Sequence, residues 1–147
     1  MTMTATRTDE TVRIRRLLED WASAARAGDL DGIMAAYAPD IRSFDAVGQL
    51  QFEGADAYRR HWQACLELCA GMIFEVHQLD LETGDGVAFG HYLVRCGGTG
   101  PDGQEQVGWM RGTVCCRKAG GRWQIAHEHF SVPFDMASGK ALLGLEP

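Results

Sequence analysis

The sequence predicts an α+β domain in which a cone-shaped barrel of curved, mostly antiparallel sheet wraps around three N-terminal helices. Up to Gly71, most segments carry apolar residues at the three-and-four spacing of a buried helical face. From Met72 onward, strand-like segments are separated by the turn signals TGDG, GGTGPDG and KAGG. Helices followed by consecutive strands are typical of an α+β fold with a single core.

Capping residues and turn residues set the expected bounds of the elements. Thr8 or Asp9 is placed to cap the first helix, and Gly28 is placed to end it. Pro39 is expected to stop the second helix, which is short. The helices are expected over residues 9–27, 29–38 and 54–70, and the strands within 41–52 (a short pair), 72–81, 87–96, 104–117 and 122–132.

Composition and charge narrow the classes of function. The chain has 147 residues, of which 46% are hydrophobic, and this suits a single domain over residues 9–147 behind a flexible segment over 1–8. The formal net charge is −6, which argues against nucleic acid or an anionic membrane as a partner. The five cysteines have no paired spacing, and no apolar run is long enough to cross a bilayer, so we expect a reduced, cytoplasmic protein.

The last predicted strand, Trp123 to Val132, contains two histidines. Strict alternation puts His127 and His129 on the same face as Trp123 and Ile125, which predicts that both imidazoles point into a pocket. The alternative is a pair of histidines satisfied by neighbouring groups within the sheet.

The KAGG turn decides which residues face these histidines. A loop of two or four residues would place His129 opposite Met110, and a loop of three residues would place it opposite Arg111. We favour Trp109, Arg111 and Thr113 as pocket neighbours, because a charged arginine in mid-strand is easier to accommodate beside polar groups. An arginine that extends to solvent is the alternative.

Asp45 is a second candidate, because aspartate is disfavoured in the strand-like run SFDAV. One explanation is a pocket carboxylate, whose pKa burial would raise and which could then remove a proton next to a carbonyl group. The other is a turn aspartate that accepts hydrogen bonds from backbone amides.

Further candidates are predicted for substrate binding. They are Tyr37, Trp62, His91, Trp109 and Asp135. Asp135 could orient His129 from behind. On the third helix His61 is a minor candidate, and Trp62 shares an apolar face with Tyr58, so a core position is its alternative. The HEH run could also bind a metal with Asp45 or His91, but the remaining ligands are not near in sequence, so no metal site is predicted.

Three segments carry a family resemblance: YAPDIRSFDAVG, FEGADAYRRHW and GRWQIAHEHFSVPFD. They resemble the SnoaL-like members of the nuclear transport factor 2-like superfamily over roughly residues 12–140. The resemblance implies the cone fold shared by ketosteroid isomerase, scytalone dehydratase, limonene epoxide hydrolase, polyketide cyclases and a kinase association domain. It also implies a small-molecule pocket between the helices and the concave sheet face, with a homodimer formed through the outer sheet face.

The fold hosts several reactions, so the site must indicate the function. We expect a cofactor-independent acid/base enzyme of polyketide cyclase or isomerase type, in which Asp45 is the acid or base. His127 or His129 would be its partner, and Arg111 would stabilise an enolate-like oxygen. The alternatives are a metabolite-binding or a dimerisation domain. No tyrosine with a second carboxylate is evident beside Asp45, so ketosteroid isomerisation itself is not predicted.

Overall fold

The described part of the chain folds into three helices and six strands. The structure is a computed structural model, and it describes residues 6–147. The elements are α1 (Arg7–Ala27), α2 (Leu30–Met34), β1 (Tyr37–Phe44), β2 (Phe52–Glu53), α3 (Ala55–Leu68), β3 (Ala70–Thr83), β4 (Val87–Thr99), β5 (Glu105–Ala119) and β6 (Arg122–Ser131).

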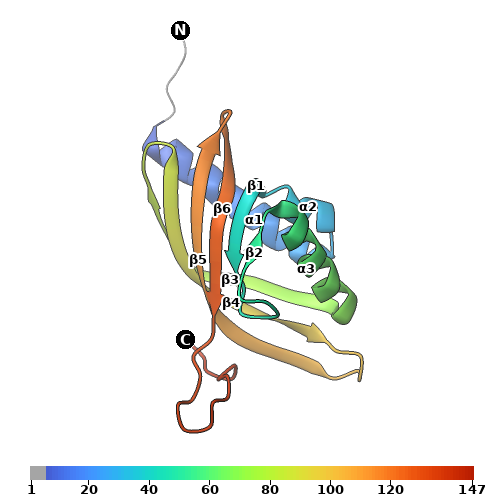
Figure 1. The fold of residues 1–147 in the computed structure, drawn as a ribbon. Helices are drawn as coiled ribbons and strands as arrows, with labels where there is room; N and C mark the ends of the chain where they lie inside the picture. Colours follow the sequence, from blue (N-terminus) through green and yellow to red (C-terminus); the bar gives the residue numbers. More distant parts are fainter. Residues whose placement is uncertain (1–5) are drawn as a thin grey trace.

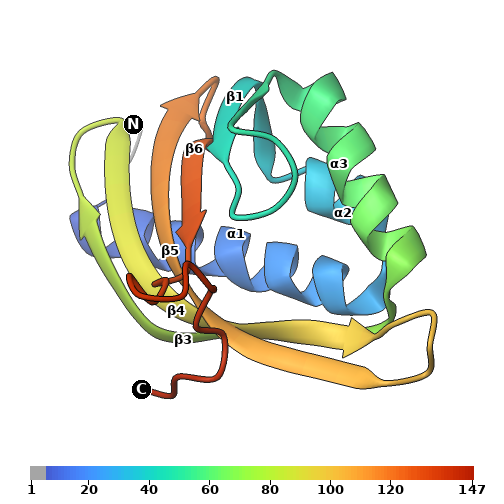
Figure 2. The ribbon, with the colours of Figure 1, turned by 60° about the horizontal axis from the view of Figure 1, so that its bottom comes forward.

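All six strands form one sheet in the order β2-β1-β6-β5-β4-β3. Every pairing is antiparallel except that of β1 with β6, which is parallel. The long strands β3, β4 and β5 bend strongly, so that the sheet curls around α1 while α2 and α3 cover its open side (Figures 1 and 2). The predicted α+β cone is therefore confirmed, with the sheet remaining open and not closed into a complete barrel.

The first helix begins earlier than its predicted cap. Thr6 caps α1, and its side chain exchanges hydrogen bonds with Asp9 in a capping box, while Gly28 ends the helix in the left-handed conformation. Residues 6–8, predicted to be flexible, thus form the start of the helix. Residues 1–5 of the predicted flexible segment lie outside the described residues.

The second helix is shorter than predicted, because β1 takes over before Pro39. Helix α2 ends at Met34, and Tyr37 already pairs with Ile125 of β6. The register of β1 against β6 shifts between Tyr37 and Arg42, and Pro39 lies within this irregular stretch. A proline lacks the N–H that a regular ladder needs, so it fits where the ladder is interrupted.

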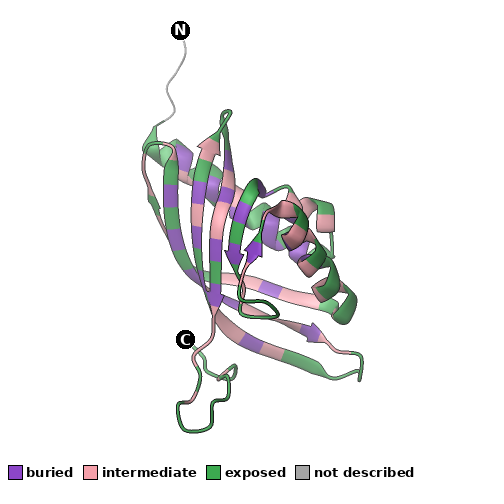
Figure 3. Ribbon diagram, in the orientation of Figure 1, coloured by how far each residue is buried: buried purple, intermediate pink, exposed green. Residues whose placement is uncertain are grey.

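The core lies between α1 and the concave face of the sheet. Trp21 is buried at its centre, with its ring 5.0 Å from that of Phe74 and 6.3 Å from that of Phe130. Buried residues alternate with exposed ones along the strands, as expected for a sheet with one covered face (Figure 3). Among the described residues, no helix is both long enough and apolar enough to cross a membrane.

Candidate active site

A bulge in β6 decides which side chains enter the cone. Cys116 pairs with Ile125 and Cys115 pairs with His127, so Ala126 is an extra residue without a partner on β5. An extra residue reverses the alternation of all residues that follow it. Trp123 and Ile125 before the bulge are buried, and Glu128 and Phe130 after it are buried as well.

The prediction that His127 and His129 point into the pocket is therefore wrong. His129 is exposed on the outer face, and the Nδ1–H of His127 donates to the carbonyl of Arg42 at 2.7 Å. A two-residue turn at 120–121 and the bulge together place His129 opposite Thr113, which differs from both predicted registers.

The other candidates grouped with these histidines also lie outside the cone. Arg111 is exposed and donates through Nε to Ser131. His91 is exposed beside Asp80, and Trp109 packs against His77. His129 pairs with Thr113, and Thr113 pairs with His91, so all three lie on the outer face. Arg111 and Trp109 lie two and four residues before Thr113 on β5 and therefore share that face.

Asp135 does not orient His129 either. Its carboxylate accepts the backbone N–H of Ser138 at 2.8 Å, within the turn that follows β6. Hydrogen bonding by the side chain of Ser138, and then by its backbone N–H, holds the pKa of Asp135 below its ordinary value. Asp135 therefore shapes the C-terminal turn.

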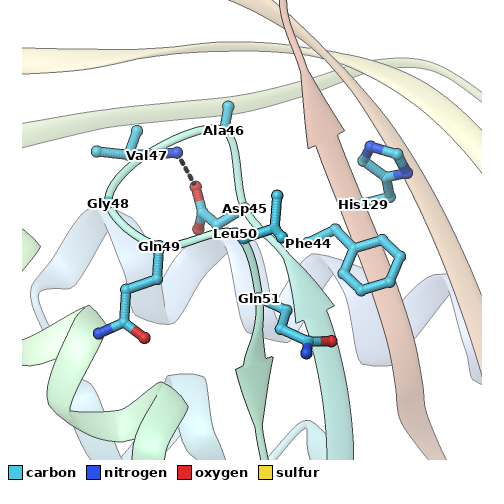
Figure 4. A pocket seen from close by; sticks show the side chains of 9 residues that line it. All are labelled: Phe44, Asp45, Ala46, Val47, Gly48, Gln49, Leu50, Gln51 and His129. Atoms are coloured by element: carbon cyan, nitrogen blue, oxygen red, sulfur yellow. Dashed lines mark hydrogen bonds between the residues drawn. The ribbon is translucent and has the colours of Figure 1, made fainter.

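Asp45 and His129 both line an open depression on the surface, together with Phe44 and residues 46–51. In Figure 4 the Asp45 carboxylate is turned toward the loop, where it accepts the N–H of Val47, and the imidazole of His129 is turned away from it. The imidazole rings of His127 and His129 each pack edge-on against the ring of Phe44. These contacts keep both histidines on the outer face of the sheet.

A second cavity, which is partly open to solvent, lies inside the cone between α3 and the concave face of the sheet. Its volume is about 190 Å³. Apolar and sulfur-containing side chains form most of its wall, and the only ionisable oxygen and nitrogen groups in the wall belong to Asp45 and His61. The lining residues are Asp45, Val47, His61, Trp62, Cys65, Cys69, Met72, Ile73, Phe74, Cys96, Gly97, Met110 and Phe130. Asp45 and Trp62, both candidates from the sequence, are therefore in the wall.

Asp45 and His61 form a close pair in this wall. The His61 Nε2 lies 3.2 Å from the Asp45 Oδ2, and the two side chains are only 11% and 13% exposed. The hydrogen bond to Asp45, aided by Cys65, raises the pKa of His61 to about 9 although burial opposes the charge. At neutral pH the imidazole of His61 is therefore protonated and positively charged.

Glu128 lies behind this pair and is fully buried. Its Oε1 accepts the hydroxyl of Tyr37 at 2.8 Å and that of Tyr58 at 2.5 Å. The Tyr37 oxygen in turn accepts the indole N–H groups of Trp21 and Trp62. Burial raises the pKa of Glu128 to about 8, against the lowering effect of the two tyrosines, so this carboxyl is mostly protonated at neutral pH.

Tyr58 connects the two carboxyl groups. Its hydroxyl oxygen lies 2.5 Å from Glu128 Oε1 and 3.2 Å from Asp45 Oδ2, but it has a single hydrogen to donate. Burial and the nearby carboxyl groups raise the pKa of Tyr58 well above its ordinary value, so it keeps that hydrogen. The shorter contact shows that Tyr58 donates mainly to Glu128, with Asp45 as a second, weaker acceptor of the same hydrogen.

Sequence reasoning missed part of this group. His61 appeared only as a minor candidate, and Tyr58 was predicted as core because it shares a helical face with Trp62. The spacing of Tyr58, His61 and Cys65 along one face of α3 was the available signal. No sequence signal marked Glu128, because regular alternation along the strand places it on the outer face. Tyr37 was predicted to bind ligand, and it instead supports Glu128 from beneath the cavity wall.

From the sequence, no tyrosine with a second carboxyl group was evident beside Asp45. The structure places Tyr58 and Glu128 behind Asp45, so both groups are present.

Within residues 6–147, no cluster of three or more His, Cys, Asp or Glu side chains is arranged to hold a metal ion.

Comparison with known families agrees with this architecture. The family model for the SnoaL-like domain matches residues 14–135. The chain belongs to the SnoaL-like family. An NTF2-like protein of unknown function from Pseudomonas putida KT2440 is 45% identical to this SnoaL-like chain, with a TM-score of 0.89 over 97% of this chain and 100% of the other.

More distant solved structures share the fold alone. A protein from Streptomyces avermitilis that carries the provisional name of a dehydratase of the NTF2-like family has a TM-score of 0.78 at 12% identity, covering 86% of this chain and 97% of its own. One from Novosphingobium aromaticivorans, provisionally named a scytalone dehydratase, has a TM-score of 0.77 at 12% identity, covering 94% of both chains. No curated protein matches the chain.

Proposed function

We propose that this SnoaL-like protein is a cofactor-independent acid/base enzyme of the cyclase, isomerase or dehydratase kind. The observation that carries the proposal is the Asp45–His61 pair, whose atoms lie 3.2 Å apart in the wall of a largely apolar cavity. A carboxyl group and an imidazolium in a largely apolar wall are the groups needed to move a proton on a carbon acid.

In the proposed reaction, Asp45 removes a proton from the carbon next to a substrate carbonyl. The electron pair of that C–H bond moves into the carbonyl group, and the resulting enolate oxygen is stabilised by the His61 imidazolium. The proton on Asp45 then returns to another carbon in an isomerisation, or to a leaving hydroxyl in a dehydration. No electrons are gained or lost overall, so the step needs no redox cofactor.

The support from Glu128 and Tyr58 fits this role. A hydrogen bond from Tyr58 holds the Asp45 carboxylate in place, and a neutral Glu128 adds no second negative charge behind it. Two structures of the same fold that are provisionally named dehydratases favour the same reaction class. The alternative is a binding protein that holds a metabolite in this cavity without converting it.

Two further proposals concern the oligomeric state and the cellular location of the protein. The outer sheet face, which carries the exposed Val87 and Phe89, is proposed as a homodimer interface. A cytoplasmic setting remains a proposal that follows from the reduced cysteines.

Deuterium exchange tests the proposed function without knowledge of the natural substrate. A panel of small cyclic ketones is incubated with the enzyme in D₂O, and deuterium entry next to the carbonyl is followed by mass spectrometry. Wild type is expected to accelerate exchange in at least one ketone, and His61→Gln is expected to lose about 100-fold of that rate. His129→Ala is the control on the outer face and should exchange as wild type does. Equal rates in His61→Gln and wild type would remove His61 from the reaction.

A further inference from the structure

The wall of the inner cavity also restricts what can bind there. We infer that the cavity takes an uncharged ligand of one ring, with a single oxygen function directed at Asp45 and His61. This inference rests on the proposed function for the role of that oxygen, but it concerns binding and can be tested separately from catalysis.

The first argument is charge. No lysine or arginine is in the cavity wall, and its only charged groups, Asp45 and His61, are paired with each other. A carboxylate or phosphate ligand would leave water without gaining a free positive partner, which is costly. Anionic metabolites are therefore disfavoured.

The second argument is the chemistry of the wall away from that pair. The rings of Trp62, Phe74 and Phe130 line the cavity together with five sulfur-containing side chains. These are Cys65, Cys69, Met72, Cys96 and Met110. Burial raises the pKa of Cys96 to about 11, so its thiol is neutral at physiological pH. Polarisable sulfur and aromatic edges pack well against a ring but offer few hydrogen bonds to a polyoxygenated molecule.

The third argument is size. The cavity holds about 190 Å³, and an apolar cavity of about 150 Å³ is known to hold a benzene molecule. The extra volume admits only a few more heavy atoms, so one ring with a small substituent fits. Three or four fused rings exceed this volume, so part of such a ligand would have to extend out of the mouth of the cavity.

The two inner methionines provide a direct readout. Wild-type protein labelled with ¹³C at the methionine methyl groups is titrated with p-cresol, which is neutral and has one ring and one oxygen. Met72 and Met110 line the cavity, and Met136 is 91% exposed in the C-terminal tail. We expect saturable shifts of the Met72 and Met110 signals and none for Met136, so Met136 is an internal control within the same sample.

Two comparison ligands test the limits on charge and size. Benzoate has the same ring with a negative charge, and 9-phenanthrol has one oxygen on three fused rings. Both are expected to bind at least about tenfold more weakly than p-cresol, a difference of about 1.4 kcal/mol. Comparable binding of benzoate would overturn the inference on charge, and comparable binding of 9-phenanthrol would overturn the inference on size.

A variant that fills the cavity confirms the location. Ile73→Trp is expected to abolish p-cresol binding, and Val12→Trp, on the exposed face of α1, is expected to leave it unchanged. Circular dichroism checks that both variants are folded. If Ile73→Trp does not fold, the methionine titration of the wild-type protein alone decides whether p-cresol binds in the cavity. Unshifted Met72 and Met110 signals at saturating p-cresol would refute the inference.

Failure of this inference and failure of the proposed function give different results. Binding of p-cresol without deuterium exchange in any ketone would support the ligand class and contradict the enzyme. Exchange confined to anionic or polycyclic ketones would support the enzyme and contradict the ligand class.

Discussion

Glu128 is expected to make the folded protein less stable as the pH rises. Its pKa is about 8 in the folded protein, against 4.5 for an ordinary glutamate. Between these values the folded state keeps a proton that the unfolded state has lost. The unfolded state is therefore favoured as pH increases through this range, and the full loss of stability is reached above pH 8.

The size of this loss of stability follows from the difference between the folded and unfolded pKa of Glu128. A difference between about 8 and 4.5 corresponds to a loss on the order of 5 kcal/mol at about 1.4 kcal/mol per pH unit. His61 acts in the same direction at higher pH: its contribution is present below pH 6.5 and is lost as the pH rises through about 9. A variant is needed to separate the two groups.

Glu128→Gln supplies that separation, because the amide cannot ionise and its oxygen can still accept from Tyr37 and Tyr58. Urea denaturation at pH 5, 7 and 9 measures the free energy of unfolding of wild type and variant. We expect a steep loss in wild type and a much smaller loss in Glu128→Gln, which retains only the part due to His61. Glu82→Gln, on the exposed side of β3, is the matched control and should follow wild type. Parallel curves for wild type and Glu128→Gln would show that Glu128 is ionised in the folded protein.

Three further outcomes are expected. In Asp45→Asn, the pKa of His61 should fall from about 9 toward 6.5, because its largest stabilising hydrogen bond is lost, as measured by NMR titration of the imidazole; an unchanged value would contradict the pairing. Tyr37→Phe should lower the free energy of unfolding by about 1–3 kcal/mol, because Glu128 loses a donor and two indole N–H groups lose their acceptor; urea denaturation checks this, and an unchanged midpoint would refute it. Phe89→Glu should convert a dimer to a monomer in sedimentation velocity, and a monomeric wild type would contradict the proposed interface.

Much of the fold could be predicted from the sequence because its signals are local. Gly28 ends α1, and the glycines of the KAGG turn connect β5 to β6 where the turn chemistry requires them. Tertiary pairing overrode the expectation for Pro39, since Tyr37 pairs with Ile125 before the proline is reached. The pattern of apolar residues does not predict this pairing.

The site was harder to predict because one residue changes it. Ala126 is bulged, and nothing about its side chain marks the position, yet it exchanges His129 for Glu128 inside the cone. Asp45 lies in the cavity wall and also accepts the backbone N–H of Val47, so the structure combines the two explanations that the strand-like run left open. Its partner His61 comes from α3, and only the folded chain brings these two residues together.

The most direct test of the central claim compares Asp45→Asn with wild type in the deuterium exchange assay at pH 7. Asp45→Asn keeps the shape of the side chain and removes the base. If Asp45 is the base, the initial rate of deuterium entry into the ketone that wild type exchanges best should fall by about 100-fold or more while the variant stays folded. Exchange by Asp45→Asn at the wild-type rate would contradict the account.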